Sequence, residues 1–189
     1  MHTHKILNLN FTPFPLLETE RLILRATVAG DVDEIFYLRS NAEVMKHIRK
    51  APAATTDDAM AYIDRVNNSL ASNGGISWAI SLKDNTRLIG CIGLWRIEKE
   101  HYRGEIGYML HPEQQGKGLM DEAMKAVLDY GFNVIGLHSV EGQINPTNIA
   151  SQKILERNGF IREAYFRESY YYNGVFGDYA VYSLLKPDK

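Results

Sequence analysis

The sequence predicts an α+β fold built on one mixed, mostly antiparallel sheet flanked by helices. Helical segments dominate the N-terminal third, three alternating strands follow, and a strand, a helix and a hairpin complete the chain. Such grouping of helices and strands is typical of this class, whereas a parallel α/β fold alternates them throughout. The 189 residues contain no repeat and no long linker, so we expect a single domain over 1–189, with 1–16 as an N-terminal extension.

The N-terminal half contains the first strand, two helices and the three-stranded meander. Residues 20–26 alternate apolar and polar side chains as a strand does, and residues 30–41 then place apolar side chains at helical spacing. A second helix is expected from Thr55, which opens a capping box, to the glycine pair at 74–75. The three strands expected to pair antiparallel cover 76–83, 88–97 and 105–111.

The C-terminal half begins with an amphipathic helix whose apolar face repeats at helical spacing. That face consists of Leu119, Ala123, Met124, Val127 and Tyr130. A strand is expected at 138–145, and a further helix runs from a cap near Asn145 to Asn148 to a stop at Gly159. The Asn-Gly pair at 173–174 predicts a terminal hairpin.

Charge and cysteine content narrow the functional classes. The formal net charge is −2 and the pI is about 6.3, so the basic excess typical of nucleic-acid-binding domains is absent. Cys91 is the only cysteine, which excludes an intrachain disulfide and a multi-cysteine zinc site and fits a reducing compartment. No apolar run approaches the roughly 20 residues of a membrane span. We therefore expect a cytoplasmic protein that binds neither nucleic acid nor membrane.

A glycine-rich turn, "QQGKGL" at 114–119, lies directly before the amphipathic helix. Such a turn offers converging backbone N–H groups, glycines that let an anion approach, and the positive end of a helix dipole. It is not a P-loop, because Gly118 follows Lys117 where that motif needs Ser or Thr, and Asp121 replaces the third glycine of a dinucleotide fingerprint. From these residues alone, a phosphate-binding turn and a turn without a ligand both stay open.

The segments "GEIGYMLHPEQQGKGLMDEAM" and "INPTNIASQKILERNGF" resemble the GNAT superfamily of N-acetyltransferases, and more closely its RimJ/RimL branch of ribosomal-protein N-terminal acetyltransferases. The resemblance covers most of the chain, from "LETERLILR" to "YSLL". It implies the GNAT acyl-CoA N-acyltransferase fold, acetyl-CoA as cosubstrate, and a pyrophosphate held by the signature Q/RxxGxG/A. Gln115, Gly118 and Met120 occupy its marked positions. Met120 departs from the usual Gly or Ala, and a backbone contact there requires its side chain to point into the core.

The resemblance also implies where acetyl-CoA binds. The strand before the turn is expected to contact the pantetheine arm and the thioester carbonyl, and the turn is expected to hold the pyrophosphate. The start of the later helix, which is capped near Asn145 to Asn148, is expected to contact the arm and the thiol. The residues implied are Met109, Leu110, Gln115, Gly116, Lys117, Gly118, Leu119, Met120, Asn145, Asn148 and Ser151. Helix capping is the alternative for the two asparagines, and a solvated side chain is the alternative for Lys117.

Two residues are candidates for catalysis. Acetyl transfer to an amine needs a base for the amine proton and an acid for the departing thiolate. Strand alternation places Glu105 opposite the apolar face of its strand, and the resemblance implies that an acidic residue there faces the acceptor amine, directly or through water. Ser151 lies where similar enzymes place a Ser or Tyr hydroxyl near the thiol. A strand-end surface charge and a helix-surface serine are the alternatives.

The acceptor is the least constrained part of the prediction. An α-amine with a pKa of about 7.7 to 8.0 needs less help from a base than a lysine amine near about 10.4, and the resemblance favours direct transfer to a protein N-terminus in a ternary complex. Acetylation of a small amine, such as a polyamine, an amino acid or an antibiotic, stays open. So does an acyl-CoA-binding module without turnover. Glu98, Glu100 and Glu105 are compatible with a cationic acceptor.

Three further features remain from the sequence. No metal site is expected, because His2 and His4 lie at the terminus without a third ligand. The tyrosines at 170–172 alternate on a strand, so they form either packing or one wall of an acceptor pocket. Cys91 is expected to be a buried small hydrophobic side chain. A homodimer stays open.

Overall fold

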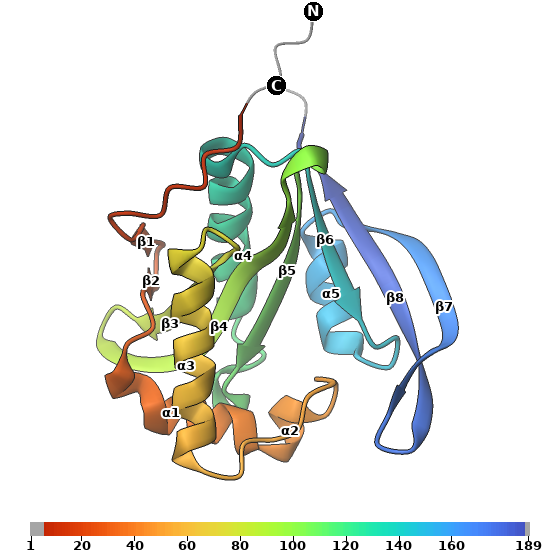
Figure 1. Ribbon diagram of the computed structural model, residues 1–189, viewed down its shortest axis with the longest axis horizontal. Helices are drawn as coiled ribbons and strands as arrows, with labels where there is room; N and C mark the ends of the chain where they lie inside the picture. The colour runs from red at the N-terminus through yellow and green to blue at the C-terminus, as the bar shows by residue number, and fades with distance from the viewer. Residues whose placement is uncertain (1–5, 188–189) are drawn as a thin grey trace, which may run out of the picture.

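The computed structural model describes residues 6–187, which form an eight-stranded sheet with helices on both faces (Figure 1). The strands are β1 (Leu17–Glu18), β2 (Leu22–Arg25), β3 (Ile76–Leu82), β4 (Asn85–Glu98), β5 (Arg103–Leu110), β6 (Ser139–Ile144), β7 (Ile161–Tyr172) and β8 (Val175–Leu185). The helices are α1 (Val32–Ser40), α2 (Ala42–Met45), α3 (Thr56–Ala71), α4 (Leu119–Asp129) and α5 (Ile149–Arg157). The α+β class predicted from the sequence is confirmed.

The strand order is β1-β2-β3-β4-β5-β6-β8-β7. Strands β2 to β5 pair antiparallel in the predicted meander, and β8 lies between β6 and β7 in the terminal hairpin. The sequence pattern did not predict β1, the short α2, or the π-helical turn Tyr130–Ile135 that extends α4. These short elements lack the repeated periodicity on which the prediction relied.

The pairing between β5 and β6 is parallel and short. It joins Arg103–Glu105 to Ser139–Glu141, and the two strands then separate. Each strand is held by its other neighbour beyond this point, because β4 pairs with β5 as far as Leu110 and β8 pairs with β6 as far as Ile144. The sheet therefore opens between β5 and β6, as the diverging strands in Figure 1 show.

Two apolar clusters hold the helices against the sheet. On one face, α4 packs on a cluster that includes Trp78, Ile92 and Met124, each fully buried. On the other face, α1 and α3 pack through Ile35 and Ile63 on a smaller cluster that contains Cys91 and Met109. The predicted apolar face of α4 and the predicted burial of the cysteine are confirmed.

The predicted helix starts and the hairpin turn are also confirmed, whereas α3 ends at Ala71, three residues before the predicted stop at Gly74. Thr55 and Asp58 form a capping box at α3, and the Asn148 side chain accepts a hydrogen bond from the Ser151 N–H at the start of α5. Gly159 takes a positive φ of 84° after α5, which glycine adopts without steric cost. The Asn-Gly turn after β7 likewise has positive φ at both residues, the geometry that matches strand twist in a hairpin.

The segment before β1 packs onto the fold. Phe11 is 3% exposed, and the Trp78 indole donates a hydrogen bond to the Pro15 carbonyl at 2.8 Å. The N–H of Asn8 bonds to the Ile135 carbonyl at 2.8 Å. Between residues 6 and 187, no helix combines the length and apolar character needed to cross a membrane.

Packing of α4 makes a prediction about stability. Met124→Ala should lower the free energy of unfolding by about 2–5 kcal/mol, because the side chain is fully buried and its removal leaves a cavity. Lys125→Ala on the same helix changes an exposed side chain and should shift the free energy of unfolding by less than about 1 kcal/mol. Urea denaturation of both variants measures the difference, and equal effects would contradict the assigned packing.

Candidate active site

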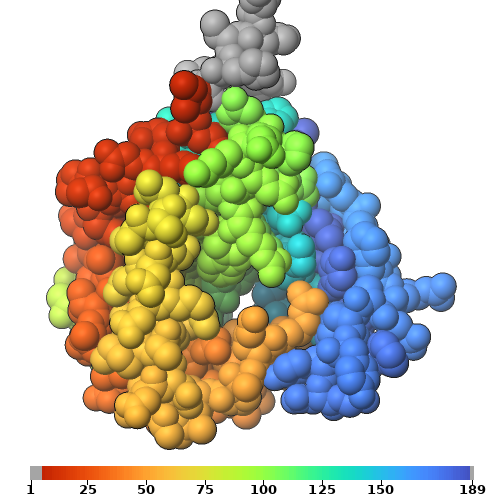
Figure 2. Space-filling view, viewed as in Figure 1, coloured from red at the N-terminus to blue at the C-terminus, as the bar shows by residue number. Residues whose placement is uncertain are grey.

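The opening between β5 and β6 is reached from both faces of the sheet. Glu105 lies on the face covered by α1 and α3, since alternation along β5 places it on the same side as Met109 of that cluster. Ser151 lies in the first turn of α5, on the opposite face. On the α3 side, Figure 2 shows a hollow bounded by α3 (yellow), residues 46–55 (orange), the green β4–β5 strands and the blue hairpin.

Glu105 is largely covered but is not isolated. Its side chain is 13% exposed, and its carboxylate accepts a hydrogen bond at 2.8 Å from the Arg96 guanidinium, which is 71% exposed. Arg96 takes a positive φ of 47° in a bulge that follows Trp95 in β4. The bulge turns the arginine toward the carboxylate, so the acidic group predicted from the sequence carries a counter-charge that alternation could not reveal.

A tryptophan forms an apolar wall beside Glu105. Trp95 pairs with Glu105 across the strands, and its ring lies directly over Gly107 of β5. A Cβ atom at Gly107 would overlap this ring, so glycine is required for the indole to lie flat on the strand. The sequence pattern did not predict a role for Trp95, because it is one of several apolar residues in its strand.

Ser151 contacts a partly buried tyrosine. The Tyr108 hydroxyl lies 3.5 Å from the Ser151 main-chain oxygen, which is at the limit of a hydrogen bond. Burial raises the pKa of Tyr108 to about 12, so the phenol stays protonated at neutral pH. Alternation along β5 places Tyr108 on the apolar face with Ile106 and Leu110, and only the packing of α5 against the separated strand brings the hydroxyl to Ser151.

The two asparagines serve the local backbone. The Asn148 carboxamide oxygen caps α5 through the Ser151 N–H at 3.1 Å. The Asn145 oxygen accepts hydrogen bonds from the N–H and hydroxyl of Thr147, and its amide donates to the Tyr170 hydroxyl at 3.3 Å. The capping alternative is thus present for Asn148, and a cofactor contact by either residue stays a prediction.

The glycine turn presents its backbone rather than its side chains. Gly116 and Gly118 have positive φ angles of 73° and 77°, which lead directly into α4. Leu119 and Met120 are each 4% exposed, so the side chain of Met120 points into the core as its departure from the signature requires. The Gln115 side chain donates to the Leu110 carbonyl at 3.2 Å and ties the turn to the end of β5. Converging N–H groups at a helix start are suited to an anion.

Arg21 fixes the orientation of this turn. Its guanidinium donates to the Lys117 carbonyl at 2.9 Å and to the Glu122 carboxylate at 2.7 Å. In a trans peptide the carbonyl and the following N–H point in opposite directions, so anchoring the Lys117 carbonyl directs the Gly118 N–H away from Arg21. Burial opposes ionisation of Glu122, but hydrogen bonds from Thr19 and Arg21 outweigh it and lower its pKa. Arg21 is a positioning residue that the sequence analysis missed.

The remaining polar candidates lie elsewhere. His2 and His4 are outside the described residues, and between 6 and 187 no three His, Cys, Asp or Glu side chains come close enough to hold a metal ion. Lys117 donates to the Gln114 side chain at 3.1 Å, beside the turn. Burial raises the pKa of the Cys91 thiol to about 12, which makes it unreactive at neutral pH.

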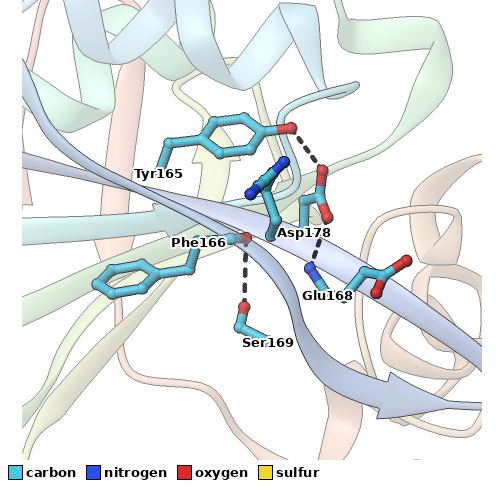
Figure 3. A pocket seen from close by; sticks show the side chains of 6 residues that line it. Tyr165, Phe166, Glu168, Ser169 and Asp178 are labelled. Carbon is cyan, nitrogen blue, oxygen red and sulfur yellow. Dashed lines mark hydrogen bonds between the residues drawn. The ribbon is translucent and has the colours of Figure 1, made fainter.

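A shallow pocket on the hairpin is distinct from the opening (Figure 3). There the Tyr165 hydroxyl donates to Asp178 at 2.5 Å, and the Glu168 N–H donates to the second Asp178 oxygen at 2.8 Å. Glu168 takes a positive φ of 46° where β7 loses register between Phe166 and Tyr170. These bonds satisfy Asp178 and fix the bulge, so they shape the hairpin.

Known proteins share this architecture. The family model described as an acetyltransferase (GNAT) domain matches residues 21–161. The chain is 36% identical to an uncharacterized N-acetyltransferase, YoaA of Bacillus subtilis (strain 168), over 92% of this chain and 98% of YoaA. It is 32% identical to the spermidine N(1)-acetyltransferase of Escherichia coli (strain K12), over 81% of this chain and 80% of that enzyme.

Solved structures agree with these relatives. A GNAT-family acetyltransferase from Bacillus anthracis superposes with a TM-score of 0.81 at 27% identity, covering 90% of this chain and 98% of its own. RimL, a ribosomal L7/L12 alpha-N-protein acetyltransferase in complex with coenzyme A, superposes with a TM-score of 0.83 at 19% identity, covering 90% and 98%. The latter likeness concerns the fold alone.

The conformation of the turn can be tested through CoA binding. Gly118→Val should weaken binding of CoA by at least tenfold, because a β-branched residue avoids positive φ and would turn the backbone N–H groups. Calorimetric titration of the folded variant measures this. Gly30→Ala, where a Cβ meets open space, is the matched control. Unchanged affinity in Gly118→Val would remove the turn from the cofactor site.

Arg21 offers a second test at the same turn. Arg21→Met keeps the aliphatic stem and removes both hydrogen bonds, so CoA affinity should fall by about 3- to 10-fold, the worth of roughly one hydrogen bond. Lys83→Met removes an exposed ion pair elsewhere on the sheet edge and should leave affinity unchanged. Equal affinities in both variants would show that the turn keeps its orientation without Arg21.

Proposed function

The chain belongs to the GNAT family of acetyltransferases, and from this premise we propose that it acetylates the N-terminal α-amine of a protein or peptide. It is an acetyl-CoA-dependent N-acetyltransferase. The proposal concerns the acceptor and the residues that act on it. The acceptor amine attacks acetyl-CoA directly in a ternary complex, without an acetylated residue of this chain.

We place acetyl-CoA in the opening between β5 and β6. Beyond Glu105 the edge of β5 is free of β6, so the strand at Met109 and Leu110 can border the pantetheine arm there, with the Leu110 carbonyl already bonded to Gln115. The N–H groups of residues 116–120 bind the pyrophosphate at the start of α4, and Lys117 adds positive charge beside it. Asn145, Asn148 and Ser151 border the arm from the α5 side.

Glu105 and Ser151 then have complementary roles. Acetyl-CoA supplies the thioester, and transfer breaks its C–S bond while an N–C bond to the acceptor forms. Glu105 accepts the proton that the amine loses, directly or through one water. Ser151 donates a proton to the departing sulfur, with Tyr108 as its partly buried neighbour. Their positions on opposite faces of the opening support this division and disfavour a binding module without turnover.

The proposed acceptor follows from the ion pairs that the acidic side chains near the opening make with arginines. Glu105 is bound by Arg96, and its neighbour Glu141 accepts hydrogen bonds from Arg103, one of them at 2.9 Å. Glu98 and Glu100 lie at the β4–β5 turn, away from the hollow. A polyamine carries several positive charges and needs unpaired carboxylates, whereas an α-amine presents one amine, which is partly neutral at pH 7. This arrangement favours a peptide N-terminus.

Acetylation of a polyamine is the second candidate. It is favoured by the relatives named as spermidine acetyltransferases in Escherichia coli and Vibrio cholerae. The hollow in Figure 2 is open to solvent on the α3 side, which suits an extended peptide as well as a small amine. We further propose a cytoplasmic location, since the lone thiol is buried and reduced.

Glu105 can be tested through its pH dependence. Glu105→Gln keeps the shape of the side chain but cannot accept a proton, so turnover near neutral pH should fall by roughly 10²-fold, with CoA affinity unchanged. The deficit should shrink as pH rises, because the fraction of neutral amine grows. A steady-state pH profile measures both. A variant profile that matches the parent in height and shape would exclude Glu105 as the base.

The acceptor can be tested with matched peptides. A short peptide with a free Ser or Ala N-terminus should be acetylated at that amine. The same peptide with a blocked N-terminus and an internal lysine should react far more slowly, because the lysine amine is more fully protonated. Mass spectrometry locates the acetyl group. Preference for lysine, or turnover with spermidine alone, would overturn the peptide assignment and leave the acetyltransferase activity standing.

A further inference from the structure

An arginine bridges the two sides of the hollow. The Arg49 guanidinium lies 4.6 Å from the ring centroid of Tyr170 and 5.6 Å from that of Tyr179. Arg49 belongs to the segment between α2 and α3, whereas the two tyrosines belong to the β7–β8 hairpin. Figure 2 shows this orange segment reaching the blue hairpin beneath the hollow. The contact places one positive charge at the rim through which an acceptor would enter.

Contacts with β6 and with the hairpin itself hold the two tyrosines in place. The Tyr170 hydroxyl bonds to Asn145 at the end of β6, and the Tyr170 ring lies over Gly177, where a Cβ would overlap it. Tyr179 stacks on Phe166 at a centroid distance of 4.9 Å. An arginine over two fixed aromatic rings keeps its N–H groups free at its edges, because the ring faces attract the cation without using its donors.

The segment that carries Arg49 is basic. Lys46, Arg49 and Lys50 are exposed, and none has a carboxylate within ion-pair distance among residues 6–187. Burial and the charge of Lys46 lower the pKa of His47, so it adds no charge at neutral pH. Glu43 of α2 is the nearby acidic group. In a chain of net charge −2, this local excess of cations is selective for anions.

The position of Arg49 relative to Glu105 limits which residue of an acceptor peptide can place a carboxylate beside the guanidinium. Glu105 pairs with Glu141 of β6, and Tyr179 immediately precedes Ala180, the residue of β8 that pairs with Ile144. Glu141 and Ile144 are three residue steps apart in β6, an offset of about 10 Å along the strands at about 3.3 Å per residue. In an extended peptide, the third Cα lies about 7 Å from the first, and a carboxylate adds a few ångströms.

We propose that Arg49, supported by Lys46 and Lys50, selects acceptors that carry a carboxylate at the second or third residue after the reacting amine. This inference rests on the proposed function and narrows it to N-termini with early acidic residues. The guanidinium donates to the carboxylate while it stays over the two rings. The same charge repels polyamines and N-termini with early lysines.

The test uses three C-terminally amidated peptides that begin with Ser and differ only at positions two and three, as Asp-Asp, Asn-Asn or Lys-Lys. With saturating acetyl-CoA, the kcat/KM of the parent enzyme should be about tenfold higher for Asp-Asp than for Asn-Asn, and lowest for Lys-Lys. Arg49→Gln should lower kcat/KM for Asp-Asp more than for Asn-Asn and so reduce the Asp-Asp preference to about twofold or less. Arg49→Lys should retain part of the preference.

Arg162→Gln is the matched control, because Arg162 is exposed on β7 and pairs opposite Tyr182 rather than facing the hollow. It should keep the parent preference. Acetylation of all three α-amines without regard to charge, or an Arg49→Gln enzyme that keeps the preference, would overturn this inference and leave the proposed function standing. Acetylation of spermidine alone, with no peptide modified, would overturn both.

Discussion

The early end of pairing between β5 and β6 is the constraint on which the site depends. Because β4 and β8 hold these strands along their other edges, the strands can separate without losing their place in the sheet. Separation frees the edge of β5 beyond Glu105 and lets α5 bring Ser151 to the face of the sheet opposite Glu105. A fully paired sheet would fill this space with backbone hydrogen bonds and leave no passage between the faces.

The turn before α4 depends on a contact that is distant in sequence. Glycines permit its positive φ angles, but many glycine turns bind nothing, and the hydrogen bond from Arg21 to the Lys117 carbonyl sets which way its N–H groups point. The Glu122 carboxylate, in the first turn of α4, accepts hydrogen bonds from Arg21 and so holds the arginine in place. The orientation of the turn is therefore built from strand β2 and helix α4 together.

Local signals in the sequence were sufficient for the longer elements and for the strand face on which Glu105 lies. Caps, alternation and turn residues predicted α3, the meander, α5 and the terminal hairpin, and alternation placed Glu105 on the correct face of its strand. The same rule did not predict a role for Tyr108, because residues on the apolar face of a strand normally pack in the core. Arg96 was missed because a bulge breaks the alternation, and Arg21 and Arg49 were missed because their partners lie far along the chain. Such contacts follow from topology, which periodicity does not specify.

In the proposed complex, cofactor and acceptor meet between β5 and β6, and the acceptor leaves on the α3 side. A crystal structure with a conjugate that joins the CoA sulfur through an acetyl link to the α-nitrogen of a Ser-Asp-Asp peptide tests it most directly. The account predicts the link between Glu105 and Ser151, the pyrophosphate at residues 116–120, and the peptide in the hollow beside Arg49. A peptide that leaves on the α5 face, or a pyrophosphate held away from the turn, would contradict it.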